Sequence, residues 1–153
     1  MKKNNFYLSR VLFRDLKLTY DLTNEKTVRK WSLNPSRIKY ESHETWFKKK
    51  LKKKEFYFWK LMKNSECYGL IRIELIRKKY ELSYLIAKKF RGKNLGSKII
   101  ILAMQKIYKK KSNVTKIFAK SFIKNNFSNI TLLKSGFKLM RKIKYLNYYV
   151  YKK

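Results

Sequence analysis

The sequence contains few of the residues that bind metals or form cross-links. Its 153 residues include one cysteine, Cys67, and one histidine, His43. A lone cysteine excludes an internal disulfide, and two such residues are too few for a zinc site. Cys67 falls in a predicted turn without a partner base, which argues against nucleophilic catalysis by its thiol. The sequence therefore predicts a protein without a metal.

Long hydrophobic runs and linkers are also missing. The longest apolar run, Ile99 to Met104, is far shorter than the roughly 20 residues of a membrane-spanning helix. Charged residues interrupt the first twenty positions, which argues against a signal peptide. The chain has one proline, 44% hydrophobic and 16% aromatic residues. We expect one cytoplasmic domain over residues 1–153, either a monomer or a homodimer.

Acidic residues are scarce. Nine Asp and Glu stand against 41 Lys and Arg, so the net charge is +32. Such a charge attracts RNA, DNA or anionic membranes. The abundance of Lys, Ile, Asn, Tyr and Phe is also typical of AT-rich coding sequence, and this codon bias is our preferred explanation. No acidic residue follows Glu81, whereas residues 82–153 contain 19 basic ones, so this half suits a polyanionic ligand.

Alternation and helical spacing of apolar residues predict an α+β fold with a mixed, mostly antiparallel sheet flanked by helices. The expected strands cover residues 6–16, 55–63, 69–75, 80–87, 115–122 and 144–152. Four helices are expected. Three of them cover residues 24–31, 96–110 and 127–135, and Gly136 is the C-cap of the last. The fourth begins with Ser42 as its N-cap.

The segments 69–75 and 80–87 predict a hairpin. In the register that is symmetric about its turn, Glu74 faces Glu81 and Arg72 faces Ser83. Two carboxylates that face each other repel, which raises the pKa of one toward a value useful to a base. The alternative is that Arg72 and Lys79 neutralise the pair on a solvated face.

Two of the four glycines, Gly92 and Gly96, lie in "AKKFRGKNLGSKII", between a predicted strand and a predicted helix. Backbone N–H groups at a helix start can converge on an anion, and glycine permits close approach or a positive φ. Arg91, Lys93 and Lys98 add positive charge. The spacing fits a phosphate cradle and an ordinary connecting loop equally well.

The segment "RGKNLGS" resembles the acetyl-CoA loop of the GNAT acyltransferase superfamily, Q/R-x-x-G-x-G/A, with Arg91 first and Gly96 last. Asn94 stands where the pattern has glycine, and asparagine tolerates the left-handed conformation. The segment "NNFSNITLLKSGF" is similar to the N-x-x-S/A block of the superfamily, with Asn125 and Ser128 at its two positions.

A third segment resembles one branch of the superfamily, whose members acetylate amino groups on nucleotide-linked sugars, as in pseudaminic-acid pathways. It matches I-x-x-E-x-H-x-x-W-F from Ile38 to Phe47, and the whole resemblance covers roughly residues 10–140. It implies a GNAT fold, acetyl-CoA as donor and a primary amine on a nucleotide-linked amino sugar as acceptor. The expected acceptor-binding residues are Glu41, His43, Trp46 and Arg72.

The resemblance also implies which residues bind CoA. Main-chain N–H groups of the loop would bind the pyrophosphate, the strand before it would pair with the pantetheine arm, and Asn125 would contact that arm. The expected CoA-binding residues are Leu85, Ile86, Arg91, Gly92, Lys93, Asn94, Leu95, Gly96, Ser97, Asn125 and Ser128. Leu132 replaces the tyrosine that many members use as general acid, which excludes a phenol at that position.

Acetyl transfer needs an unprotonated amine, and a base favours that form. The candidates are Glu81, which is our first choice, Glu74 and His43. Two other functions remain open at this point: a ribosomal-protein-type N-terminal acetyltransferase, and a basic RNA-binding module without enzymatic activity. A salt titration distinguishes them, because phosphate-backbone binding weakens strongly with salt.

Overall fold

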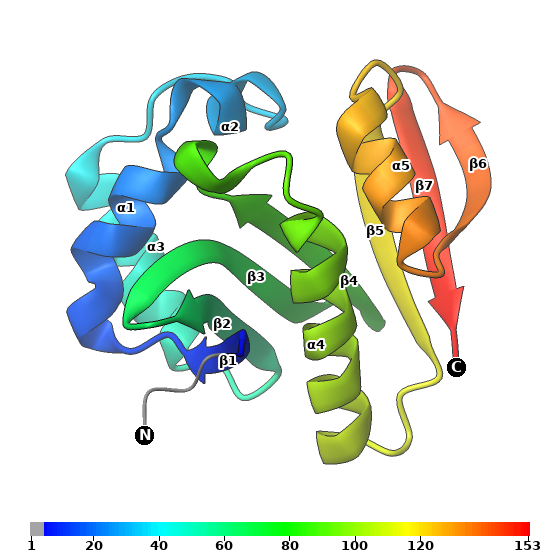
Figure 1. The fold of residues 1–153 in the computed structure, drawn as a ribbon, viewed down its shortest axis with the longest axis horizontal. Coiled ribbons are helices and arrows are strands. Elements are labelled where there is room, and N and C mark those ends of the chain that lie inside the picture. Colours follow the sequence, from blue (N-terminus) through cyan, green and yellow to red (C-terminus); the bar gives the residue numbers. More distant parts are fainter. Residues whose placement is uncertain (1–4) are drawn as a thin grey trace.

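A single mixed sheet organises the molecule. The computed structural model describes residues 5–153, and within them seven strands follow the order β1-β2-β3-β4-β5-β7-β6 (Figure 1). All neighbouring strands are antiparallel except β4 and β5, which are parallel. The strands are β1 (Tyr7–Arg10), β2 (Phe56–Lys63), β3 (Glu66–Ile76), β4 (Lys79–Ile86), β5 (Lys116–Phe122), β6 (Lys138–Ile143) and β7 (Leu146–Lys152).

Helices cover both faces of this sheet. They are α1 (Leu16–Thr23), α2 (Lys26–Lys30), α3 (Tyr40–Leu51), α4 (Leu95–Lys110) and α5 (Asn126–Lys134), with short 3-10 turns at Phe13–Asp15 and Lys88–Phe90. On one face, Ile99 and Ala103 of α4 pack with Ile71 and Ile73 of β3. On the other, Phe47 of α3 packs against β2. This confirms the predicted α+β sandwich.

The hairpin of β3 and β4 has the predicted register. Glu74 pairs with Glu81, and Arg72 pairs with Ser83. Its turn residues have positive φ, 47° at Arg77 and 65° at Lys78, so both adopt the left-handed conformation of a tight two-residue turn. The two sheet faces of the hairpin therefore carry the residues that the alternation predicts.

The N-terminal prediction is wrong in part. The opening strand ends at Arg10 rather than continuing to residue 16, and α1 follows. Asp15 explains why the strand ends early. Its carboxylate accepts a 2.7 Å hydrogen bond from the Leu12 N–H and forms a 2.7 Å ion pair with Lys60. The expected helix over residues 24–31 is the shorter α2, which begins after α1 has ended.

Other boundaries differ by smaller amounts. α3 begins at Tyr40 rather than after Ser42, because the His43 N–H already bonds to the Lys39 carbonyl at 3.0 Å. The strand β6 was not predicted. All its residues are exposed at the sheet edge, so it lacks the alternation of buried and exposed positions that indicates a strand. The elements α4, β5, α5 and β7 lie within two residues of their predicted positions.

Candidate functional site

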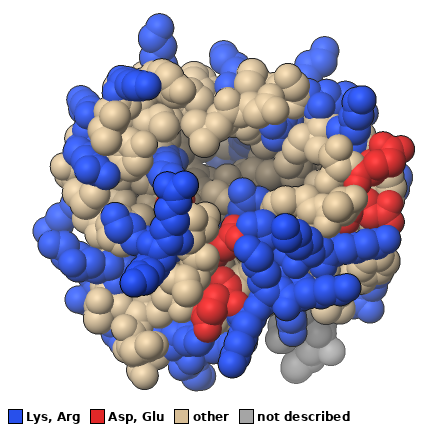
Figure 2. Space-filling model, turned by 180° about the vertical axis from the view of Figure 1, so that it is seen from behind, with Lys and Arg blue, Asp and Glu red and all other residues tan. Residues whose placement is uncertain are grey.

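The two parallel strands separate and open a cleft. β4 and β5 pair only over Tyr80–Leu82 and Ile117–Ala119, so the rest of β4 has a free edge toward β5. A cleft of about 850 Å³ lies there, lined by α2, α3 and the start of α5 as well as by the strands. Figure 2, which views the molecule from behind, shows a hollow near the middle of a face rich in Lys and Arg.

The loop after β4 leads from Arg91, which lines the cleft, to the N-terminus of α4, and the residues from Gly92 to Ser97 are not part of the cleft lining. Asn94 precedes the helix in the left-handed conformation, with φ 55°, and Gly92 has φ 78°. No side chain caps this helix start. In residues 5–153, no N–H from Gly92 to Ser97 donates a hydrogen bond. The helix start therefore leaves N–H donors free for an anion, as the phosphate-cradle prediction requires.

Gly96 has a different role from Gly92. A Cβ at Gly96 would lie 2.8 Å from Cγ2 of Thr131 and 3.3 Å from the Tyr84 ring. The missing side chain therefore lets α4 pack closely on α5 and β4. Gly92 has open space around its Cα, and its positive φ explains the glycine there.

The Arg91 side chain faces away from the cradle. Its Nε donates to the Ile86 carbonyl at 3.0 Å, one terminal nitrogen donates to the Thr27 hydroxyl, and the other lies 3.3 Å from the Glu25 carboxylate. Glu25 also accepts from the Lys88 N–H at 3.0 Å. Arg91 thus joins the loop after β4 to α2, a contact that the sequence pattern did not predict.

The start of α5 is fixed by Asn125. Its side-chain oxygen accepts a 3.2 Å hydrogen bond from the Ser128 N–H, so Asn125 is the helix cap and Ser128 the residue it holds. The Ser128 hydroxyl lies 3.4 Å from the Tyr84 hydroxyl. Burial raises the pKa of Tyr84. Leu132 is buried in the cleft wall, 1% exposed.

Glu74 and Glu81 both line the cleft, each with its own cation. Glu74 is buried, forms an ion pair with Lys50 and lies 3.7 Å from Lys53, whereas Glu81 pairs with Lys120 at 3.1 Å. The face is therefore a cleft floor and not a solvated surface. The two carboxylates are neutralised, as the alternative interpretation proposed, but by lysines other than Lys79.

The remaining predicted neutralising cations contact aromatic rings. The Lys79 ammonium lies 5.2 Å from the Phe118 ring centroid. The Arg72 guanidinium lies 5.2 Å from the centroid of Trp46, and both residues line the cleft. Lys79 is thus turned toward β5, whereas Arg72 faces the cleft beside Trp46.

His43 connects two helices. Its Nε2 lies 3.0 Å from the Thr19 hydroxyl of α1, and the ring packs against Tyr20, Trp46 and Phe47. It is 3% exposed, and burial lowers its pKa. Ser42, His43 and Trp46 reach the cleft wall, whereas Glu41 is exposed at the start of α3 and is not part of the lining.

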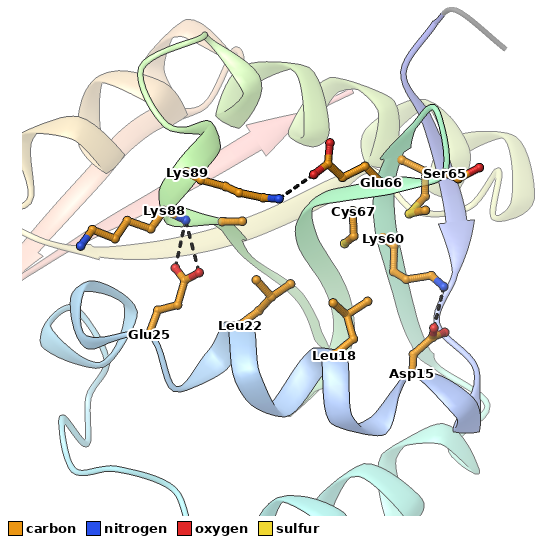
Figure 3. Close-up of a pocket in the computed structure, with 12 residues that line it drawn as sticks. Asp15, Leu18, Leu22, Glu25, Lys60, Ser65, Glu66, Cys67, Lys88 and Lys89 are labelled. Carbon is orange, nitrogen blue, oxygen red and sulfur yellow. Dashed lines mark hydrogen bonds and ion pairs between the residues drawn. The ribbon is translucent and has the colours of Figure 1, made fainter. Parts of the chain in front are cut away.

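A second cavity, of about 860 Å³, lies between α1 and the ends of β2, β3 and β4. Figure 3 shows its charged residues in pairs, Asp15 with Lys60 and Glu66 with Lys89, while Glu25 bonds to the Lys88 backbone. Cys67 lies on its wall, and burial raises the pKa of its thiol. These polar groups stabilise one another. Glu25 also bonds to Lys88 and Arg91, and so links this cavity to the loop between β4 and α4.

Two further kinds of feature are absent from the described part of the chain. Residues 5–153 contain no group of three or more His, Cys, Asp or Glu placed to hold a metal ion. Among the same residues, no helix has the length and apolarity needed to cross a bilayer.

Comparison with known proteins identifies the family. Residues 6–138 match the model of the acetyltransferase (GNAT) domain, so the chain belongs to the GNAT acetyltransferase family. It is an N-acetyltransferase that uses acetyl-CoA as co-substrate. No curated protein matches the sequence significantly.

Solved structures share the fold at low sequence identity. Aminoglycoside acetyltransferase AAC(6')-Ib with coenzyme A and kanamycin has a TM-score of 0.84 and 17% identity, over 97% of this chain and 95% of that one. Spermidine N-acetyltransferase from Vibrio cholerae, with CoA and spermine, gives 0.79 and 16%, over 95% and 92%. The ribosomal L7/L12 alpha-N-protein acetyltransferase RimL, with CoA, gives 0.82 and 15%, over 99% and 96%.

Proposed function

We propose that the acceptor is a primary amine on a nucleotide-linked amino sugar. The observation that carries this proposal is that the segment resembling the sugar-acetylating branch forms part of the wall of the cleft, which also reaches Arg91 in the loop before α4. Ile38, His43 and Trp46 of that segment line the cleft. Donor and acceptor would therefore meet in one cleft.

On this proposal, the donor binds along β4. The N–H groups from Gly92 to Ser97 bind the CoA pyrophosphate, assisted by the positive end of the α4 dipole. The pantetheine arm pairs with the free main chain of Leu85 and Ile86, as an added strand does. Asn125 holds the α5 start against the same arm.

Glu81 is the proposed base. The amine nitrogen attacks the thioester carbonyl, the C–N bond forms as the C–S bond breaks, one amine proton passes to Glu81, and CoA leaves as its thiolate, which takes a proton from water. Glu74 and His43 are weaker candidates, since Glu74 is buried beside two lysines and the His43 Nε2 is bonded to Thr19.

An acceptor screen tests the proposal. The enzyme is supplied with acetyl-CoA and with UDP-linked 4-amino sugars, the corresponding free amino sugars, or a peptide with a free N-terminus, and the release of CoA thiol and the mass of the product are measured. We expect acetylation of the nucleotide-linked sugars. Acetylation of the peptide alone would establish a ribosomal-protein-type enzyme instead, and RNA binding without transfer would establish a binding module.

A further inference from the structure

We propose that Arg72, stacked on Trp46, binds an anionic group of the acceptor, a phosphate or a carboxylate. The acceptor would then be an amine that also bears negative charge, and not a polycation. This inference rests on the proposed function in one respect, namely that the acceptor occupies the cleft beside β3.

Arg72 has the chemistry of an unused anion receptor. Its guanidinium lies over the Trp46 ring and lines the cleft. Within residues 5–153 it forms no hydrogen bond and no ion pair, although a guanidinium carries five N–H donors. Burial lowers its pKa, and the charge of Glu74 partly opposes this effect. A phosphate or carboxylate would accept two parallel hydrogen bonds from the guanidinium.

Neither nearby carboxylate forms an ion pair with this cation, although the charge of Glu74 attracts it. Glu74 is paired with Lys50 and flanked by Lys53, and Glu81 is paired with Lys120. Each carboxylate therefore already has a lysine partner on the neighbouring element. A ligand amine that sought a carboxylate would have to displace a lysine, whereas a ligand anion finds Arg72 free.

The other two arginines of the lining do not offer the same site. Arg29 donates from Nε to the Ser36 carbonyl at 2.9 Å and also to the Asn34 carbonyl, and so holds the loop before α3. Arg91 is bonded to Glu25 and Thr27. Arg72 is thus the lining arginine whose donors remain available, within the part of the chain that the structure describes.

Charge complementarity then favours an anionic acceptor over a polycation. Kanamycin and spermine, the ligands in two of the structures of similar fold, carry several amines. A polycation would meet an unpaired guanidinium on a chain of net charge +32, and like charges brought together cost binding free energy. The shared fold therefore does not extend to the acceptor class.

The test uses the whole protein saturated with CoA, so that the pyrophosphate cradle is occupied. Inorganic pyrophosphate and malonate are titrated into the wild type and three variants, Arg72→Gln, Arg72→Lys and Arg141→Gln, with Trp fluorescence and calorimetry as readouts. Arg141 is a matched control, since its guanidinium lies 5.3 Å from the Tyr148 ring but outside the cleft. CoA affinity in each variant verifies that the fold is intact.

We expect saturable binding of at least one anion to the wild type and to Arg141→Gln. Arg72→Gln should weaken it about 10- to 100-fold, and Arg72→Lys by less, because lysine keeps the charge but loses the bidentate geometry. Pyrophosphate binding alone indicates a phosphate on the acceptor, and malonate binding alone a carboxylate. Equal anion binding in wild type and Arg72→Gln would overturn the inference.

Kinetics separate this inference from the proposed function. If the enzyme acetylates nucleotide-linked amino sugars, and Arg72→Gln leaves their KM unchanged, the proposed function stands and the anion subsite is wrong. If no amine of either charge is acetylated although the anions bind at Arg72, the proposed function fails while the subsite stands.

Discussion

At the scale of single residues, Glu81 is the group on which the proposed chemistry depends. We expect Glu81→Gln to lower kcat about 100-fold, because the amide cannot accept the amine proton, with acetyl-CoA affinity unchanged. Steady-state kinetics and calorimetry measure the two quantities. Glu66→Gln is the control, since Glu66 pairs with Lys89 on the wall of the other cavity. A full loss with Glu74→Gln and none with Glu81→Gln would assign the base to Glu74.

Glu55 makes stability depend on pH. Hydrogen bonds from Lys111, first in effect, and from Tyr80 and Tyr57 lower the pKa of Glu55 from 4.5 to about 2. Because the folded-state pKa lies below the unfolded one, the unfolded chain binds the proton more tightly in this window. The stabilisation is therefore present above pH 4.5 and is lost as the pH falls toward 2.

Glu55→Gln should remove this contribution. We expect it to lower the free energy of unfolding at neutral pH by about 1 kcal/mol, with allowance for the partial exposure of the ion pair, and to flatten the acid limb. Urea denaturation at a series of pH values measures both effects. Glu41→Gln, at an exposed position, should change neither, and an unaltered acid limb in Glu55→Gln would contradict the assignment.

At the scale of elements, the strand-to-helix loop depends on backbone conformation. Asn94 has φ 55°, where alanine costs about 1–2 kcal/mol. We expect Asn94→Ala to lower the melting temperature and weaken acetyl-CoA binding several-fold, and Asn94→Gly to preserve both. Asn113→Ala, at an exposed turn with ordinary φ, is the control. Equal affinity in the alanine and glycine variants would show that the left-handed conformation is not needed for binding.

The contact between α2 and this loop should also affect the donor. Glu25 accepts hydrogen bonds from the Lys88 N–H and Arg91, so Glu25→Ala frees the segment that leads into the cradle. We expect acetyl-CoA affinity to fall about 3- to 10-fold, because the variant loses one or two hydrogen bonds to a charged group. The change in kcat at saturating substrate should be smaller. Calorimetry measures the affinity. Glu66→Ala, which removes the neighbouring pair with Lys89, should leave it unchanged.

Sequence patterns predicted those elements that have a buried face. The β3–β4 hairpin and α4 follow from apolar periodicity, and Asn94 in the left-handed conformation follows from the tolerance of asparagine for it. The edge strand β6 has no buried face, so no pattern marks it. α1 depends on the ion pair between Asp15 and Lys60, residues 45 positions apart, which periodicity does not contain.

The candidate site was predicted in its residues more than in its contacts. Ten of the seventeen expected positions line one cleft, whereas Glu41 and the loop residues from Gly92 to Ser97 do not. The partners of the carboxylates, Lys50 and Lys120, come from a different helix and strand. Tyr84 approaches Ser128 only because β4 and α5 pack together. Such long-range contacts arise from tertiary packing, which one sequence without the fold does not specify.

At the scale of the whole molecule, the charge leaves the surface basic almost everywhere. Eight of the nine acidic residues form ion pairs with Lys or Arg, and Lys and Arg side chains are spread over the face in Figure 2. This general attraction for anions falls with salt, because the exposed charges are screened. Backbone N–H groups at a helix start bind an anion by directed hydrogen bonds, and salt weakens them less.

Calorimetric titration with acetyl-CoA tests the central claim most directly, and ATP serves as the polyanion control. Each ligand is titrated at low salt and at about 0.15 M salt, where the Debye length is about 8 Å. A defined cradle along α4 and β4 predicts one-to-one acetyl-CoA binding that persists at the higher salt, with ATP failing to saturate. Weak binding of both ligands that disappears together as salt rises would contradict it, and would leave only a basic surface.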